Sequence, residues 1–282
     1  MGKGRAVTTR HYALAVDDRP IGVFDSGFGG LTVARALLDL VPDEDLVYVG
    51  DTGRYPYGPR QLDEVRDFAR QITSFLIDTH GVKMVVVACN TASAAALDLL
   101  RFQYDVPVVG VIEPGLRAAI RASRNGKVGV IGTVGTIASG AYQREAGARR
   151  VPVSLTCAAC PGFVEFVERA ETDTEQVYIL AERLLAPVRT AGVDTLLLGC
   201  THYPFLARTI ADVMGRDVVL VSSAEETAFE VRSILSRAGL GRRSAGKGVR
   251  TFLSSGDVHL FRDLGRRLLG PELEDVGSVE WD

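Results

Sequence analysis

The chain has 282 residues, of which 46% are hydrophobic, and its 32 basic and 35 acidic side chains give a net charge of −3. This length allows more than one core, so we expect two lobes. The charge balance gives no general attraction for nucleic acid or an anionic membrane. No apolar run approaches the length of a spanning helix and no secretion signal is found, so we expect a cytoplasmic protein without a membrane partner.

Short β-branched runs alternate with helical patterns after residues 1–19, which we expect to be a flexible leader. This alternation is typical of a parallel sheet covered by helices. We therefore predict an α/β fold of two similar lobes, each a mainly parallel sheet flanked by helices, with the active site in the cleft between them. We assign residues 20–112 and 220–282 to lobe 1 and residues 113–219 to lobe 2. The predicted strands are 21–24, 46–49, 84–87, 106–111, 128–131, 196–198 and 218–221, and a helix is predicted over 63–79.

The first polar loop is Asp25-Ser26-Gly27-Phe28-Gly29-Gly30, between a predicted strand and a helical run. Flexible glycines and free helix amides predict an anion site. The loop lacks the third glycine of a dinucleotide fingerprint and the Gly-Lys-Ser/Thr of a P-loop. A tight βα turn would explain the glycines but not Asp25, whose carboxylate can hold or deprotonate a neighbour.

The second polar loop covers residues 51–59, where Asp51, Arg54 and two tyrosines lie among prolines and glycines. Its amides and hydroxyls can cover a polar ligand. A surface turn held by two prolines explains the composition equally well, but the position after a strand favours a site.

Two cysteines, Cys89 and Cys200, each follow an apolar run and precede hydrogen-bonding residues. Ligands in open α/β sheets bind beyond the carboxyl ends of strands, so both sulfurs are expected at a substrate site. One such cysteine would indicate a small buried hydrophobe, but the repetition favours one reaction served by two thiols. The Asp25 loop and a loop near Thr133 precede them at nearly the same spacing, which fits either an internal repeat or two ordinary βα units.

The remaining candidates are weaker. His202 lies two residues after Cys200, and a nearby imidazole can lower a thiol pKa from about 8.5. Cys157 and Cys160 have metal or redox spacing, but no further ligand pair accompanies them, so packing is the better explanation and no metal site is predicted.

Together the motifs resemble those of the glutamate racemase family, within the aspartate/glutamate racemase superfamily. The resemblance covers most of the chain, in the family's order. It implies that Cys89 and Cys200 are the catalytic acid/base pair and that Asp25 and His202 assist them. The further substrate-binding residues that it implies, with Asp25 and His202 again among them, are Ser26, Tyr57, Gly58, Asn90, Thr91, Thr133, Glu168 and Thr201. The motifs that carry it are Asp25 to Gly30, Asp51-Thr52 with Pro56-Tyr57-Gly58, Ala88 to Thr91, Gly132 to Ile137, Ala159 to Pro161 and Gly199 to Pro204.

The family's activity is the interconversion of L-glutamate and D-glutamate by two bases without a cofactor, which supplies D-glutamate for peptidoglycan, and so for cell-wall biogenesis and cell shape. By the resemblance Cys200 acts on L-glutamate and Cys89 on D-glutamate, and the protein is a homodimer. No residue pattern here indicates pyridoxal phosphate. One departure is Glu165, where many family members have proline; if Glu165 rather than Glu168 pointed into the cleft, the assignment of Glu168 would be wrong.

Two alternatives stay open at this point. The first is aspartate racemase or another two-cysteine enzyme of the superfamily, which usually lacks the Asp25 and Tyr57 loops. The second is a non-catalytic amino-acid-binding or regulatory protein with idle thiols. Proton exchange at the substrate's α-carbon separates the second alternative from either enzyme.

Overall fold

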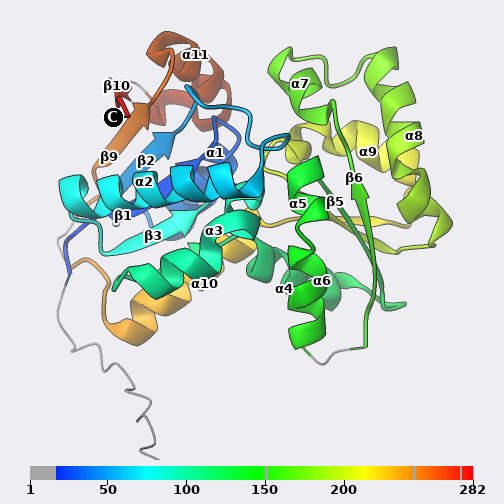
Figure 1. The fold of residues 1–282 in the computed structure, drawn as a ribbon, viewed down its shortest axis with the longest axis horizontal. Helices are drawn as coiled ribbons and strands as arrows, with labels where there is room; N and C mark the ends of the chain where they lie inside the picture. Colours follow the sequence, from blue (N-terminus) through cyan, green and yellow to red (C-terminus); the bar gives the residue numbers. More distant parts are fainter. Residues whose placement is uncertain (1–16, 150–151, 244–245, 274, 282) are drawn as a thin grey trace, which may run out of the picture.

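The computed structural model describes residues 17–149, 152–243, 246–273 and 275–281. It contains two sheets side by side, one of six strands and one of four (Figure 1). We call the six-stranded sheet with its covering helices the first lobe, and the four-stranded sheet with its helices the second lobe. All but the last three residues of the predicted leader lie outside the described residues.

Every strand pairing in both sheets is parallel, as predicted. The first sheet has the order β10-β9-β2-β1-β3-β4 and the second the order β6-β5-β7-β8. The strands are β1 (Ile21–Asp25), β2 (Leu46–Gly50), β3 (Met84–Val87), β4 (Val108–Gly110), β5 (Lys127–Gly132), β6 (Ser154–Ala159), β7 (Thr195–Gly199), β8 (Val219–Ser222), β9 (Arg250–Ser254) and β10 (Gly277–Ser278).

The two sheets repeat one topology. The order β2-β1-β3-β4 in the first sheet matches β6-β5-β7-β8 in the second, strand for strand. The strand before Cys89, β3, therefore occupies the same position as β7, the strand before Cys200. This equivalence explains why the sequence around the two cysteines looks alike.

The apolar runs form strands that are buried on both faces. In β3, Met84 and Val86 point into one hydrophobic core, while Val85 and Val87 point into a second core on the other face of the sheet. Side chains alternate between the faces of a strand, so a strand covered on both sides needs a continuous apolar run. The sequence pattern and the layered architecture thus have the same cause.

Helices cover both faces of each sheet. In the first lobe α2 and α3 lie on one face and α1, α10 and α11 on the other, whereas α7, α8 and α9 face α4 and α6 across the second sheet (Figure 1). The helices are α1 (Leu31–Leu40), α2 (Leu62–His80), α3 (Asn90–Gln103), α4 (Ile112–Ala122), α5 (Val134–Ala138), α6 (Ala141–Ala148), α7 (Phe163–Glu168), α8 (Glu175–Thr190), α9 (Ala207–Met214), α10 (Ala224–Ala238) and α11 (Val258–Leu269), with short 3₁₀ turns η1 (Tyr203–Leu206) and η2 (Gly270–Glu272).

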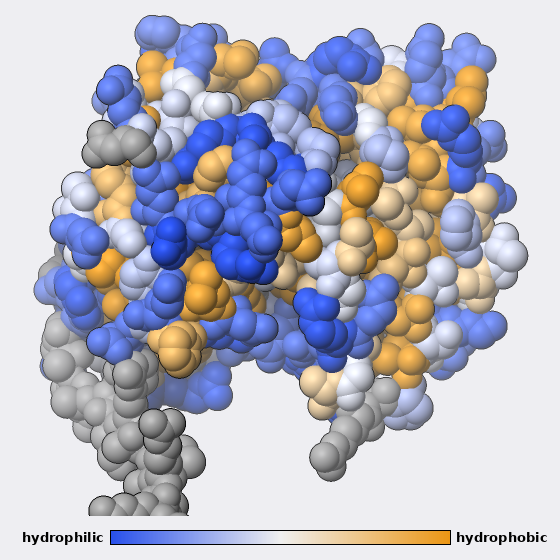
Figure 2. Space-filling view, in the orientation of Figure 1, coloured by the Kyte–Doolittle hydropathy of each residue, from blue (hydrophilic) through white to orange (hydrophobic). Residues whose placement is uncertain are grey.

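The outer face of α2 is largely hydrophilic, whereas its inner face packs on the sheet (Figure 2). This division follows the one-sided spacing of its apolar residues. Within the described ranges, no helix combines the length and the apolar character needed to cross a membrane.

The second lobe ends in β8, which runs from Val219 to Ser222 and pairs with β7. The predicted boundary between lobe 2 and the second segment of lobe 1, at residue 220, falls inside this strand. The next helix, α10, packs on α1 of the first lobe and on α4 of the second. The assignment of residues to lobes stays a prediction.

Candidate active site

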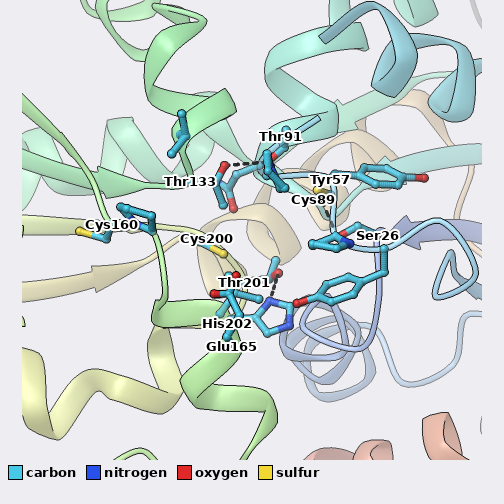
Figure 3. A pocket seen from close by; sticks show the side chains of 18 of the residues that line it. Ser26, Tyr57, Cys89, Thr91, Thr133, Cys160, Glu165, Cys200, Thr201 and His202 are labelled. Carbon is cyan, nitrogen blue, oxygen red and sulfur yellow. Dashed lines mark hydrogen bonds between the residues drawn. The ribbon is translucent and has the colours of Figure 1, made fainter. Parts of the chain in front are cut away.

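A cavity of about 90 Å³ lies between the two lobes, where the carboxyl ends of β1, β3, β5 and β7 meet (Figure 3). This volume accommodates a molecule several times the size of water. Both predicted thiols line it, one from each lobe. The lining residues are Ser26, Tyr55, Pro56, Tyr57, Gly58, Pro59, Cys89, Asn90, Thr91, Thr133, Val134, Cys160, Pro161, Gly162, Val164, Glu165, Cys200, Thr201 and His202.

Cys89 caps the N-terminus of α3. Its sulfur accepts a hydrogen bond from the amide of Ala92 at 3.5 Å and lies 3.8 Å from Ser26 Oγ. Burial raises the pKa of Cys89 to about 12, and the nearby charge of Asp25 acts in the same direction. The contacts with Ala92 and Ser26 oppose this rise because they stabilise the thiolate. The thiol is therefore the resting form, and its thiolate would be a strong base.

Cys200 occupies the equivalent position after β7, at the turn that leads into η1. Burial is the main cause that raises its pKa well above the ordinary value, and the charges of Cys89 and Asp25 add to the rise. The backbone amides of His202 and Tyr203 lower it. Because a charge on Cys89 makes ionisation of Cys200 harder, the pair favours one thiolate at a time.

His202 is buried in an aromatic setting. Its ring centroid lies 5.0 Å from that of Phe28 and 6.1 Å from that of Tyr55. Burial lowers the pKa of His202 to about 4, so the imidazole is neutral at physiological pH. His202 lowers the Cys200 pKa through its backbone amide, whereas the sequence suggested the imidazole ring.

The carboxylate of Asp25 lies next to Cys89 but does not line the cavity. It accepts a hydrogen bond from the amide of Gly30 at 2.7 Å, so the anion that this helix start binds is the chain's own Asp25. Gly30 must be glycine, since a Cβ there would lie 2.5 Å from Asp25 Cβ. Burial raises the pKa of Asp25, and Oδ1 has no hydrogen-bond partner in the described part of the chain.

Three threonine hydroxyls form a cluster across the two lobes. Thr91 Oγ1 lies 2.9 Å from Thr133 Oγ1 and 3.0 Å from Thr136 Oγ1. Beside them, Asn90 donates to Tyr142 at 2.9 Å and leaves its own Oδ1 without a partner among the described residues. None of the described lining residues is Lys or Arg. A carboxylate in this cavity would therefore be held by hydroxyls and amides.

Tyr57 and Gly58 form the wall on the first-lobe side. The Tyr57 ring points away from the two sulfurs (Figure 3), and its hydroxyl donates to Asp51. The carbonyl of Gly58 accepts a hydrogen bond from the amide of Gly135 in the second lobe at 2.9 Å. A Cβ at position 58 would lie 2.8 Å from Thr133 Cβ, so this contact between the lobes requires glycine.

Two glutamates of α7 have different positions. Glu165 lines the cavity, whereas Glu168 does not. Glu168 Oε1 lies 3.9 Å from His202 Nε2, and burial raises its pKa while the contact with Tyr55 lowers it. The structure thus places Glu168 behind His202 and Glu165 at the cavity. A substrate-binding role for Glu168 stays a prediction.

The cavity also contains residues that the sequence did not indicate for the substrate site, among them Tyr55, Val134, Cys160 and Val164. Tyr55 belongs to the 51–59 loop and Cys160 to the Ala-Cys-Pro motif, so both had a signal. Val134 belongs to the Gly132 to Ile137 motif and had the same kind of signal, whereas Val164 had none. All four cysteines are free, and no cluster of three or more His, Cys, Asp and Glu side chains that could hold a metal ion occurs in the described ranges.

The sequence and the fold are similar to those of known proteins. Residues 21–230 match the Asp/Glu/hydantoin racemase family. A glutamate racemase from Acidothermus cellulolyticus is 54% identical over 261 residues, which cover 92% of this chain and 98% of that protein. The crystal structure of glutamate racemase isoform RacE1 from Bacillus anthracis has a TM-score of 0.87 at 41% identity and covers 94% of this chain and 97% of that chain. A glutamate racemase from Francisella tularensis in complex with D-glutamate has a TM-score of 0.86 at 32% identity, covering 94% and 98%.

Proposed function

Since the chain belongs to the Asp/Glu/hydantoin racemase family, in which its relatives are glutamate racemases, we propose that its racemase reaction runs through Cys89 and Cys200. The activity is that of a glutamate racemase, an isomerase that interconverts L-glutamate and D-glutamate. D-Glutamate is required for peptidoglycan synthesis, and hence for the cell wall and cell shape. In this proposal the two thiols transfer protons, and the polar groups around them stabilise the charge that develops on the substrate.

Inversion at the α-carbon needs a base on one face of the substrate and an acid on the other. The thiolate of Cys200 removes the α-proton of L-glutamate, and the thiol of Cys89 delivers a proton to the opposite face. Afterwards Cys200 carries the proton and Cys89 is the thiolate, so the same site is ready for D-glutamate. The reverse reaction then uses the same groups in exchanged roles.

The raised thiol pKa values suit this task. A Cα–H bond is a weak acid, and a thiolate with a conjugate acid pKa of about 12 is a better base than an ordinary one. The positive ammonium group of glutamate, once bound, favours a thiolate beside it. We therefore propose that the substrate itself promotes ionisation of the thiol that attacks it.

The negative charge that develops on the substrate must be stabilised by groups already in place. The hydroxyls of Thr91 and Thr133 lie at one side of the cavity and can donate to this charge. The amide oxygen of Asn90, which is unpaired within the described part of the chain, is an acceptor, and it suits the ammonium group of the substrate. Prearranged donors in a closed site contribute several kcal/mol because they need no reorganisation. Thr201 and Ser26 line the cavity beside the two thiols and complete this set.

The observation that supports the two-thiol proposal most strongly is that Cys89 and Cys200 follow equivalent strands of two sheets and face one cavity. Changing either residue to serine should lower racemisation at least about 100-fold, because general acid/base catalysis is lost. Binding of glutamate, measured by calorimetry, should stay within a few fold.

Cys157→Ser is the matched control, since Cys157 is a free cysteine of β6 that does not line the cavity. This variant should retain the activity of the unchanged chain. Full activity of Cys89→Ser or of Cys200→Ser would rule out the two-thiol mechanism.

The setting follows from the same chemistry. We propose that the protein is cytoplasmic. The two thiols must stay reduced to transfer protons, and the cytoplasm keeps thiols reduced. The homodimer stays a prediction, to be measured by light scattering of the purified protein.

A further inference from the structure

We propose that Trp281 is a positioning residue for the substrate, which acts through Asp51 on the cavity wall formed by residues 51–59. We call this segment the wall loop. The inference rests on the proposed function, because the loop supplies Tyr57 and Gly58 to the site. It concerns a residue that does not line the cavity, whose contribution is to hold other residues in place.

Asp51 is fully buried and stands directly after β2. Its Oδ1 accepts hydrogen bonds from Trp281 Nε1 and Ser255 Oγ, each at 2.6 Å. Its Oδ2 accepts from Arg54 Nε at 2.8 Å and from the hydroxyl of Tyr57. A buried carboxylate is costly unless its oxygens are paired, so all four donors are fixed around it.

Trp281 contacts the wall loop a second time through Arg54. The guanidinium carbon of Arg54 lies 4.7 Å from the centre of the Trp281 ring and 4.2 Å from that of Phe68. A cation between two aromatic faces is held by both rings. Trp281 therefore fixes Asp51 with its N–H and Arg54 with its ring.

These contacts lead directly to the cavity. Tyr57, which donates to Asp51, lines the cavity, and the next residue is Gly58. The carbonyl of Gly58 accepts the hydrogen bond from Gly135 of the second lobe. The wall loop is thus attached to the second lobe at Gly58 and to the first lobe at Asp51, and Trp281 completes the attachment to the first lobe.

Loss of the indole N–H should weaken this attachment without touching a reacting group. Because the wall lines the cavity, it would contact the substrate before and during proton transfer alike, so its displacement should raise KM and change kcat less. Position 281 is therefore expected to control how tightly either enantiomer is held.

The test is Trp281→Phe, which keeps an aromatic ring and removes the donor. We expect KM for both enantiomers of glutamate to rise about threefold or more, with a smaller change in kcat. The control is Phe75→Leu. The Phe75 ring packs edge-on to the Trp281 ring, with 5.6 Å between the ring centroids, but its side chain has no N–H to donate to Asp51. This control should leave KM within threefold of that of the unchanged chain.

A smaller rise in Trp281→Phe, an equal rise in Phe75→Leu, or a loss of kcat larger than the rise in KM would overturn the inference. The unchanged chain is measured in the same assay, and its failure to racemise glutamate would count against the proposed function instead. If Trp281→Phe does not fold, fluorescence decides, since Trp281 is the only tryptophan of the chain. A saturable change in emission as D-glutamate is added supports the coupling, and constant emission at saturation overturns it.

Discussion

The hydroxyl of Thr91, at the start of α3 in the first lobe, lies 2.9 Å from the hydroxyl of Thr133, which caps α5 in the second lobe. Both residues line the cavity. The two lobes therefore meet in a hydrogen bond at the place where a substrate carboxylate would be held. Each hydroxyl can also donate to an anion bound beside it.

Thr133→Val tests this role, because valine has nearly the same shape but no hydroxyl. A hydrogen bond to a charged group contributes about 1.5–3 kcal/mol, so kcat/KM should fall about tenfold or more. The control is Thr209→Val, which removes the buried hydroxyl that donates to the Thr172 carbonyl outside the cavity. Equal effects of the two changes on kcat/KM would contradict a role of Thr133 in binding.

Asp25→Asn should stabilise the protein while slowing the reaction. Burial raises the pKa of Asp25, so the folded protein binds a proton more tightly than the unfolded chain, and stability is lost as pH rises through the folded pKa. Asparagine can still accept from the Gly30 amide but carries no charge. We expect Tm at pH 8 to rise by about 2 °C or more, measured by calorimetry.

Asp194→Asn provides the opposite case. Its carboxylate accepts from Ser123 Oγ and from the amides of Arg124 and Asn125, and its pKa is lowered to about 2. Stability from this group is present above its unfolded pKa and is lost as pH falls, so its removal should lower Tm at pH 8. An unchanged or lower Tm in Asp25→Asn would show that the buried charge of Asp25 does not destabilise the fold.

The lowered pKa of His202 leads to a prediction for how stability and reaction rate depend on pH. The folded pKa of about 4 lies below the unfolded value of 6.5, so this residue favours the folded state at neutral pH, and the advantage is lost as pH falls from about 6.5 to 4. The rate should show no inflection near pH 6.5 from His202, and it should rise with pH as the thiols ionise. His202→Asn should therefore lower the rate without altering the shape of the profile between pH 5.5 and 7.5.

A role of His202 on the Cys200 side alone has a further signature. Because enantiomers have equal free energies, kcat/KM must stay equal for the two directions in any variant. The asymmetry should instead appear in isotope effects: His202→Asn should increase the effect of α-deuterium in L-glutamate more than in D-glutamate. Equal increases would argue against a one-sided role.

Glu165 should weaken the binding of glutamate. Among the described residues that line the cavity it is the acidic one. Burial is the main cause that raises the pKa of nearby Glu168 and Tyr55, and the negative charge of Glu165 adds to both rises. Glu165→Gln should lower KM about twofold at low ionic strength, and the difference should shrink in high salt because exposed charges are screened. Glu182→Gln on α8, an exposed charge outside the cavity, should change KM little at either salt concentration.

Much of the fold was predictable because buried parallel strands need apolar runs. The strand over 84–87 and the helix over 63–79 match β3 and α2 to within one residue at either end. Strand β6 was missed, since it pairs on one side only and most of its residues are partly exposed, which leaves no continuous apolar run. Strand β9 starts with Arg250 and Thr251 and has only two apolar residues, Phe252 and Leu253, so it gave no such run either.

The site was predictable where it depends on residues next to strand ends. Cys89, Cys200 and the loop after β1 are all fixed locally by their strands. The contacts of Asp51 could not be predicted, because Trp281 reaches it from the far end of the chain only after the first sheet has formed. The choice between Glu165 and Glu168 likewise depends on the direction of a six-residue helix, α7, which a sequence pattern does not give.

Incubation of L-glutamate with the purified protein in heavy water, without added cofactor, tests the central claim most directly. Proton NMR follows the α-proton, and a chiral separation gives the deuterium content of each enantiomer during the first turnovers. Two thiols on opposite faces predict that D-glutamate forms with deuterium at the α-carbon while the remaining L-glutamate still carries its proton. Deuterium appearing equally in both enantiomers, or D-glutamate that keeps the original proton, would contradict the two-thiol mechanism.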